Sequence, residues 1–194
     1  MNVFDFDKTI FVADSTARFF FFELKRHPAI LLDIPAIGFA AVRYYLFRIG
    51  NKTQFKERMY RFLRRCETAK DVEDFWDQNI GGIKEFYKRI HRDDDVIVSA
   101  SPEFLLKPLE KKLHITVIAS RVSPLDGKTD GLNCYHEEKV RRFRELYPEG
   151  MIERFYSDSY SDEPLAKLAG KAYIVDGDEL IDWDYSHHKK NLRT

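Results

Sequence analysis

The second half of the sequence alternates short apolar runs with helical stretches, and this alternation constrains the fold more than any other feature. Between Val96 and Thr194, four runs are typical of β-strands and are separated by helical patterns. Such alternation is the signature of βαβ units, in which crossover helices join parallel strands. We therefore expect an α/β protein with a doubly wound, mostly parallel, Rossmann-like sheet. A chain of 194 residues is long enough to bury the core of such a sheet.

The expected strands are short and apolar, and most of them end in polar residues. They are predicted near Asn2–Asp7, Val96–Ser99, Ile115–Ala119, Ile152–Ser157 and Ala172–Val175. The helices that cover the sheet are predicted over Pro102–Leu113, His136–Tyr147 and Glu163–Leu168.

The segment between the first two predicted strands has a different composition. Residues 14–88 are rich in Phe, Tyr, Arg and Lys and carry helical spacing. Within Gln54–Arg65, apolar residues recur at the positions that form one face of an amphipathic helix. We therefore predict a catalytic core made of residues 1–13 and 89–194, interrupted by a helical domain at 14–88.

Two aspartates follow the first predicted strand. Asp5 and Asp7 are two residues apart, so we expect both carboxylates on one side of the strand end, where open parallel sheets bind ligands. Carboxylates this close repel one another, which favours a bound metal ion or a shared proton. The structural alternative is an Asp-rich turn held by hydrogen bonds to nearby backbone.

The next predicted strand ends in Ser99-Ala100-Ser101-Pro102. Ser99 lies at the strand tip, where its hydroxyl and the free N–H groups of the following helix form an anion site. Ser101 is expected to cap that helix, with Pro102 at its first position.

Three further residues carry charge near the ends of the predicted strands. Lys139 is predicted at the start of a helix, where a cation opposes the helix dipole unless an anion lies nearby. Asp158 and Asp162 follow another strand; Asp162 fits a helix N-cap, whereas Asp158 has no evident structural role unless a metal ion is bound.

These four elements, taken in chain order, resemble the haloacid dehalogenase superfamily. Its motifs are DxDxT, a strand-end Ser or Thr, a Lys, and an acidic strand end, and all four occur here in that order. The segment at 14–88 has the position of the helical cap in the phosphoserine phosphatase-like branch, subfamily IB. The resemblance covers the core at both ends of the chain.

The resemblance implies a Mg²⁺-dependent phosphomonoester hydrolase that acts through an aspartyl-phosphate. Asp5 then corresponds to the nucleophile and a metal ligand, and Asp7 to the general acid and base, with its backbone carbonyl on the metal. Asp158 corresponds to the remaining metal ligand from the protein, and Asp162 supports the ligands from behind.

The same resemblance assigns the groups that hold the substrate. Thr9, Ser99 and Lys139 are expected to bind the transferring phosphoryl group, with Lys139 also offsetting the clustered carboxylates. Asp14 has the position nearest to a glutamate that holds the substrate amine in phosphoserine phosphatases. The arginine expected later in that cap has no single counterpart in this sequence.

The substrate itself is left open between two classes. The first expectation is a small soluble phosphorylated metabolite, with phosphoserine as one candidate. The alternative is a lipid phosphatase of the phosphatidylglycerophosphate type that works at a membrane surface, for which the apolar segment Ala29–Ile49 with Arg43 and Arg48 gives a physical basis. A buried cap helix is the preferred interpretation of that segment.

Two alternative functions do not involve enzymatic turnover. An inactive member of the superfamily would bind a phosphorylated ligand without hydrolysing it, although every expected catalytic position is filled. A response-regulator receiver domain combines similar groups on a similar sheet, but its phosphoacceptor lies at the third strand and it lacks a long insertion.

Charge and cysteine content limit the partners that we expect. The 32 Lys and Arg residues balance 32 Asp and Glu residues, so no global charge favours nucleic acid or an anionic membrane. Cys66 and Cys134 lie far apart without metal-like spacing, which is typical of free thiols in an intracellular protein. The N-terminus lacks a signal-peptide pattern, and no segment is apolar enough to span a membrane. We therefore expect a cytoplasmic protein, with its oligomeric state open.

Overall fold

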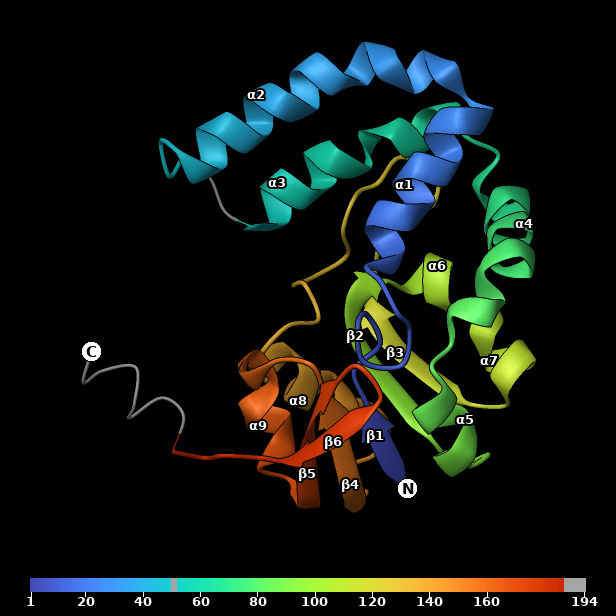
Figure 1. Ribbon diagram of the computed structural model, residues 1–194. Helices are drawn as coiled ribbons and strands as arrows, with labels where there is room; N and C mark the ends of the chain where they lie inside the picture. The colour runs from blue at the N-terminus through green and yellow to red at the C-terminus, as the bar shows by residue number, and fades with distance from the viewer. Residues whose placement is uncertain (50–51, 187–194) are drawn as a thin grey trace.

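A computed structural model describes residues 1–49 and 52–186 of the chain. Its centre is a six-stranded sheet in the order β3-β2-β1-β4-β5-β6 (Figure 1). The strands are β1 (Asn2–Phe4), β2 (Val96–Pro102), β3 (Thr116–Ser120), β4 (Ile152–Ser157), β5 (Ala169–Asp176) and β6 (Glu179–Asp182). The first five are parallel and β6 pairs antiparallel with β5. The predicted fold class is therefore confirmed.

Five of the six strands follow the predicted pattern, and all of these except β4 differ from the prediction at one or both ends. β4 has its predicted bounds, whereas β1 ends at Phe4, so Asp5 and Asp7 lie in the loop beyond it. β6 was not predicted, because it forms a short hairpin with β5 and its residues are exposed rather than apolar-periodic. Gly177, at a φ of 60°, supplies the left-handed conformation of that hairpin turn.

The segment between β1 and β2 is helical, as predicted. It contains α1 (Ser15–Arg26), α2 (Ile34–Tyr45), α3 (Lys52–Met59), α4 (Thr68–Asn79) and α5 (Glu85–Ile90), with the 3₁₀ helices η1 (Pro28–Asp33), η2 (Tyr60–Arg65) and η3 (Ile80–Gly82). The amphipathic helix predicted over Gln54–Arg65 is α-helical only as far as Met59 and continues as η2. Figure 1 shows α1, α2 and α3 over the end of the sheet where the parallel strands terminate.

Shorter helices flank the sheet after β2. They are α6 (Glu103–Leu106), α7 (Pro108–Leu113), α8 (Glu137–Leu146), η4 (Tyr160–Asp162) and α9 (Glu163–Ala166). The single helix predicted over Pro102–Leu113 is divided at Lys107, because Pro108 has no N–H to continue the hydrogen bonding of α6.

The sheet is buried on both faces. Consecutive residues of β1 point to opposite sides, so Phe4 belongs to one hydrophobic cluster and Val3 to the other. Trp76 of α4 packs in the same cluster as Phe4, and its Nε1–H donates a hydrogen bond of 2.6 Å to the carbonyl of Leu105. Although α4 lies within residues 14–88, it packs on the core of the sheet. The separation of the chain into a core and a helical domain at residues 14–88 remains a prediction.

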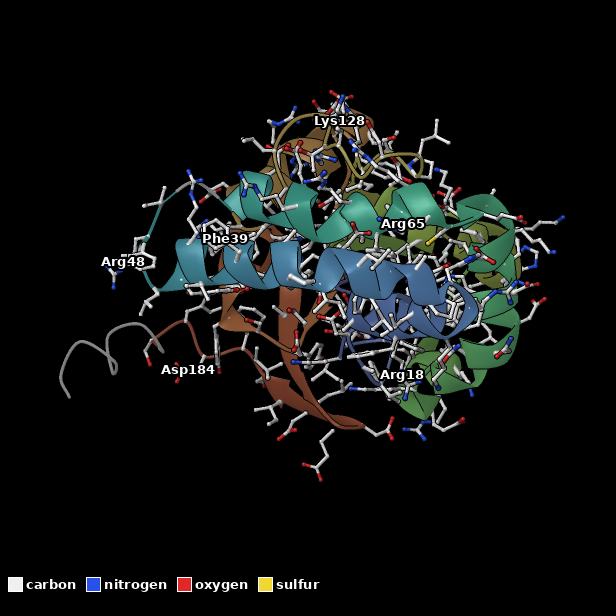
Figure 2. The ribbon with its side chains drawn as sticks, turned by 90° about the horizontal axis from the view of Figure 1, so that it is seen from above. Arg18, Phe39, Arg48, Arg65, Lys128 and Asp184 are labelled. Carbon is white, nitrogen blue, oxygen red and sulfur yellow. The ribbon has the colours of Figure 1, made fainter. Side chains whose placement is uncertain are left out.

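The α2 region projects away from this core. Phe39 is 65% exposed and Leu46 is 73% exposed, while Ala40 is buried. Figure 2 shows α2 lying along the outer side of the insertion, with Arg48 beyond its end. The interpretation of Ala29–Ile49 as a buried helix is therefore wrong. No helix within residues 1–49 and 52–186 is both long and apolar enough to cross a membrane.

Candidate active site

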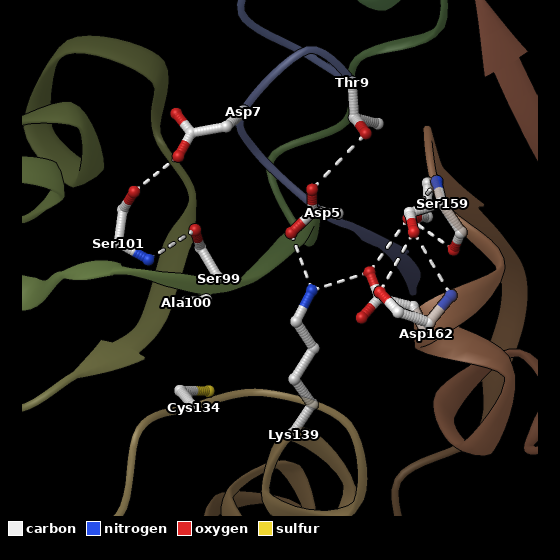
Figure 3. A network of polar contacts seen from close by, with 12 residues as sticks. Asp5, Asp7, Thr9, Ser99, Ala100, Ser101, Cys134, Lys139, Ser159 and Asp162 are labelled. Atoms are coloured by element: carbon white, nitrogen blue, oxygen red, sulfur yellow. Dashed lines mark hydrogen bonds and ion pairs between the residues drawn. The ribbon is translucent and has the colours of Figure 1, made fainter. Parts of the chain in front are cut away.

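Asp5 follows the central strand β1 and is fixed by its neighbours. Its backbone N–H donates to the carbonyl of Tyr156 on β4 at 2.8 Å. Its carboxylate Oδ1 accepts a hydrogen bond of 2.6 Å from Lys139 Nζ, and the hydroxyl of Thr9 lies 3.5 Å from Oδ2 (Figure 3). The Asp5 carboxylate thus lies at the end of the parallel strands, where such sheets bind ligands.

Lys139 connects two acidic strand ends from the first turn of α8. Its Nζ lies 2.7 Å from Asp162 Oδ2 as well as 2.6 Å from Asp5 Oδ1, and the residue is only 2% exposed. Burial alone lowers the pKa of Lys139, but attraction to Asp5 and Asp162 outweighs burial and raises it. Lys139 is therefore cationic, and the anions that its position required are present.

Asp162 was predicted to fit a helix N-cap and, from the resemblance, to support the metal ligands from behind. It occupies the N-cap position of α9 but makes no side-chain capping hydrogen bond. Instead its Oδ2 accepts from Lys139 Nζ and, at 2.8 Å, from the Ser157 hydroxyl. Asp162 therefore positions Lys139 against Asp5.

The carboxylates at the ends of β1 and β4 have the donor chemistry of a magnesium site. Burial raises the pKa of Asp5 to about 7, with Lys139 opposing the shift. The pKa of Asp158 is raised by burial and then by the charge of Asp162. Thr9 accepts a hydrogen bond of 2.8 Å from the Asp158 N–H, which holds the two strand ends together. Buried and partly buried carboxylates that repel one another, with oxygen as the only ligand atom, fit a hard divalent cation.

Asp7 is held in a different environment from Asp5. Its Oδ1 accepts from the N–H of Ser15 at 2.8 Å, and its Oδ2 accepts from the Ser101 hydroxyl at 2.5 Å. Figure 3 shows the Asp7 side chain directed toward Ser101, whereas Asp5 is directed toward Lys139. Burial raises the pKa of Asp7 although both serines oppose the shift. A carboxyl group with a raised pKa is suited to donate a proton.

The hydroxyls of β2 are arranged differently from the prediction. Ser101 does not cap a helix, because it and Pro102 extend β2, where Pro102 pairs with Ser120. Ser101 binds Asp7 and also lies 3.1 Å from the Thr16 hydroxyl. Ser99 is buried, and its Oγ accepts from the N–H of Ser101 at 3.1 Å.

Sequence reasoning therefore missed Ser101 and Ser15 as neighbours of Asp7, and Thr16 as a neighbour of Ser101. The available signal was the run Asp14-Ser15-Thr16, which marks a helix start close behind the DxDxT motif. A helix starting there directs backbone N–H groups toward the strand ends, and Ser15 N–H does bond Asp7.

A cavity of about 550 Å³ extends from Asp7 and Ser101 into the insertion. Its lining comes from α1, α2, α3, η2 and the end of β2, and includes Asp14, Phe20, Phe21, Ile37, Tyr44, Lys56, Met59 and Phe62. Asp14 is the N-cap of α1, where its side chain accepts from the N–H of Ala17 at 2.8 Å. Among the described lining residues the walls are mostly apolar, and none is an arginine.

Comparison with protein families gives one match. The family model described as haloacid dehalogenase-like hydrolase matches residues 3–167, which includes Asp5, Lys139 and Asp162. No curated protein shows significant sequence similarity to the chain.

Solved structures share the fold at low sequence identity. A protein with unknown function from Bordetella pertussis Tohama I is 19% identical, with a TM-score of 0.72, and the match covers 100% of this chain and 95% of that one. A phosphoserine phosphohydrolase-like protein from Francisella tularensis is 18% identical, with a TM-score of 0.53 and coverage of 90% and 87%. A HAD family hydrolase from Salmonella enterica subsp. enterica serovar Typhi is 15% identical, with a TM-score of 0.56 and coverage of 87% of this chain and 60% of that one.

Proposed function

The chain belongs to the haloacid dehalogenase-like hydrolases, and from that premise we propose that it is a Mg²⁺-dependent phosphatase that forms an aspartyl-phosphate on Asp5. One observation carries the proposal. Two aspartates of the same loop have opposite surroundings, since Asp5 contacts a buried lysine while Asp7 contacts only uncharged donors. This difference suits an ionised nucleophile beside a protonated acid.

In the first half of the reaction, the Asp5 carboxylate attacks phosphorus and a new P–O bond forms as the ester P–O bond breaks. Asp7 transfers its proton to the departing alkoxide, which leaves as an alcohol. In the second half, Asp7 takes a proton from water as that water attacks the aspartyl-phosphate. Inorganic phosphate leaves, and the Asp5 carboxylate and the Asp7 acid are restored.

The phosphoryl group and its charge are held by residues around Asp5. Lys139 favours the ionised form of Asp5 and offers a positive charge at its oxygen, while Thr9 and Ser99 supply hydroxyls near adjacent strand ends. Mg²⁺ would be held by the carboxylates of Asp5 and Asp158 and the backbone carbonyl of Asp7. When bound, it supplies positive charge that offsets the phosphate dianion.

The cavity beside Asp7 limits the substrate class. We propose a small phosphorylated metabolite with an apolar portion next to the phosphate, because Phe20, Ile37 and Phe62 line the cavity. Phosphoserine fits less well: Asp14 is available for an amine, but no arginine of the described lining faces the carboxylate of an amino acid.

A phosphorylated lipid at a membrane surface is the second candidate. The exposed apolar residues of the α2 region favour it, since they include Leu31, Leu32, Phe39, Val42, Leu46 and Phe47. Ile37 and Tyr44 of α2 line the cavity, so a lipid tail entering along α2 would lead to Asp7.

The test is phosphate release from amino-acid, sugar, nucleotide and lipid monophosphates, with Mg²⁺ and with a chelator. Hydrolysis that requires Mg²⁺ and disappears in Asp5→Asn supports the proposal. Asp182→Asn is the matched control, because Asp182 is a surface residue of β6 paired with Lys171. Release from no substrate, with a bound phosphate analogue, would instead indicate an inactive binding module.

The lipid candidate has a separate readout. Phe39→Glu places a charge on the exposed side of α2 without touching the described cavity lining. If the substrate is a membrane lipid, this variant loses activity on vesicles and retains activity on short-chain soluble analogues. Equal activity of both proteins on vesicles would exclude a role for α2 in membrane contact.

A further inference from the structure

A second group of reactive side chains lies in the helical insertion, at the opposite end of α1 from Ser15. Glu23 and His27 come from α1 and its C-terminus, and Cys66 follows η2. One ligand atom from each of these three residues lies within 4.8 Å of the others. Asp71 of α4 is adjacent, with its Oδ2 at 3.0 Å from His27 Nε2.

Glu23 is the unexplained member of this group. The residue is 0% exposed, and neither carboxylate oxygen accepts a hydrogen bond from a nitrogen or oxygen donor among the described residues. The His27 Nε2 atom lies 3.4 Å from Oε2 as an ion-pair contact. Burial raises the pKa of Glu23 to about 7, opposed first by the Cys66 thiol, which is a weak hydrogen-bond donor. A buried carboxylate without a strong hydrogen-bond donor is unfavourable, so another group is expected to meet its charge.

The nearby guanidinium of Arg26 does not meet this requirement. Arg26 pairs with Asp71 at 3.0 Å and with Asp74 at 2.8 Å. Asp71 also accepts a hydrogen bond of 3.0 Å from the N–H of Glu67. The positive charge of Arg26 is thus directed to α4 rather than to Glu23.

The residue types match the ligands of one class of metal ion. Thiolate, imidazole and carboxylate together select a borderline-soft ion such as Zn²⁺, whereas Mg²⁺ takes oxygen ligands. Glu23 and His27 are four residues apart, which places them on one face of α1. Cys66 reaches the same point from the segment between η2 and α4, and it is only partly buried, so an ion has access to the site.

We propose that Glu23, His27 and Cys66 bind a zinc ion, with Asp71 as the fourth ligand. Binding replaces the proton of the Cys66 thiol, and the proton of Glu23 where it is protonated, and both protons pass to solvent. The ion would join the end of α1 to the start of α4, which packs on the core through Trp76. The site therefore stabilises the insertion, independently of the proposed phosphatase reaction.

The test uses the full chain after removal of metals with a chelator. Titration with Zn²⁺ by calorimetry is expected to give one site that releases protons, and titration with Co²⁺ to give a thiolate-to-metal charge-transfer absorption. Zn²⁺ raises the unfolding temperature, and Mg²⁺ at the same concentration does not reproduce the charge-transfer or proton-release signals. Cys66→Ser and Glu23→Gln each lower the Zn²⁺ affinity at least tenfold.

Cys134→Ala is the matched control, because Cys134 is fully buried in the core and lies outside the cluster. This variant should bind Zn²⁺ like the unchanged protein. Should Cys66→Ser fail to fold, alkylation of the unchanged protein decides the matter, since bound Zn²⁺ protects Cys66. Zn²⁺ affinity unaltered in Cys66→Ser, or Cys66 alkylated equally with and without Zn²⁺, would overturn the proposal.

Discussion

Replacing Lys139 by methionine tests how the buried charges of the site are balanced. Methionine retains most of the apolar stem and removes the ammonium group that lies 2.6 Å from Asp5 Oδ1 and 2.7 Å from Asp162 Oδ2. Both carboxylates are more than nine-tenths buried, at 8% and 3% exposure. Without Lys139, two buried negative charges face one another and the variant is expected to be strongly destabilised.

The expected loss of unfolding free energy is about 3–5 kcal/mol, the usual cost of removing one member of a buried ion pair. For a chain of this size, that loss lowers the unfolding temperature by about 6–20 °C. We would measure urea and thermal unfolding by circular dichroism at pH 7, with a chelator so that no divalent cation replaces the ammonium. Lys167→Met is the control, because Lys167 pairs with Glu163 while 61% exposed, and it should unfold like the unchanged protein.

Adding Asp162→Asn to Lys139→Met should restore part of the lost stability, because it removes one of the two uncompensated charges. The reasoning is refuted if Lys139→Met costs less than about 1 kcal/mol, a value typical of exposed pairs. It is also refuted if the double variant is less stable than Lys139→Met.

Three further results are expected. Asp7→Asn should lower kcat by about 10²–10⁴-fold, because it removes the proposed acid; steady-state kinetics check this. Mg²⁺ binding should be retained, because the backbone carbonyl of residue 7 is still present, and a Mg²⁺ titration checks this. Ser101→Ala should lower kcat by about 10-fold or more through loss of one hydrogen bond to Asp7, and an unchanged kcat contradicts the assigned contact. Hydrogen bonds from Arg141 and then Arg142 lower the pKa of Glu138 to about 2, whereas its pKa in the unfolded chain is about 4.3. The ionised Glu138 therefore stabilises the folded protein above about pH 4.3, and this contribution is lost as the pH falls toward 2. Glu138→Gln should therefore show a weaker pH dependence of urea unfolding between pH 5 and pH 3, and equal slopes would contradict this.

The sequence predicted the convergence of Asp5, Ser99 and Asp158 because parallel strands end at the same edge of a sheet. These three positions were located from the ends of apolar runs, and β1, β2 and β4 lie side by side in the structure. Lys139 was predicted at a helix start, and its place beside Asp5 was expected from the resemblance to the family. Apolar periodicity is local, and the rule for parallel sheets adds the long-range information. That combination was sufficient for the arrangement of the strand ends.

The structural features that the sequence did not predict depend on contacts between segments that are distant in the chain. Ser101 and Pro102 have the local pattern of a helix start, but pairing of Pro102 with Ser120 keeps them in β2. The apolar residues of α2 have helical spacing, yet spacing cannot tell whether a partner covers the helix, and here Phe39 is exposed. Cys66 has no metal-like spacing in sequence, because Glu23 and His27 reach it only after α1 packs beside η2.

Asp5 and Asp7 show why spacing alone does not assign catalytic roles. Two residues apart in a strand, they would share one side and one environment. The strand ends at Phe4, before either aspartate, and the chain turns from Phe6 onward, so the two carboxylates do not follow the alternation of a strand. Asp5 then contacts a cation from α8, and Asp7 contacts a hydroxyl from β2 and an amide from α1. Burial raises the pKa of both, but only Asp5 has a cation in contact that favours its ionised form, and this asymmetry supports the proposal of Asp5 as the nucleophile and Asp7 as the acid.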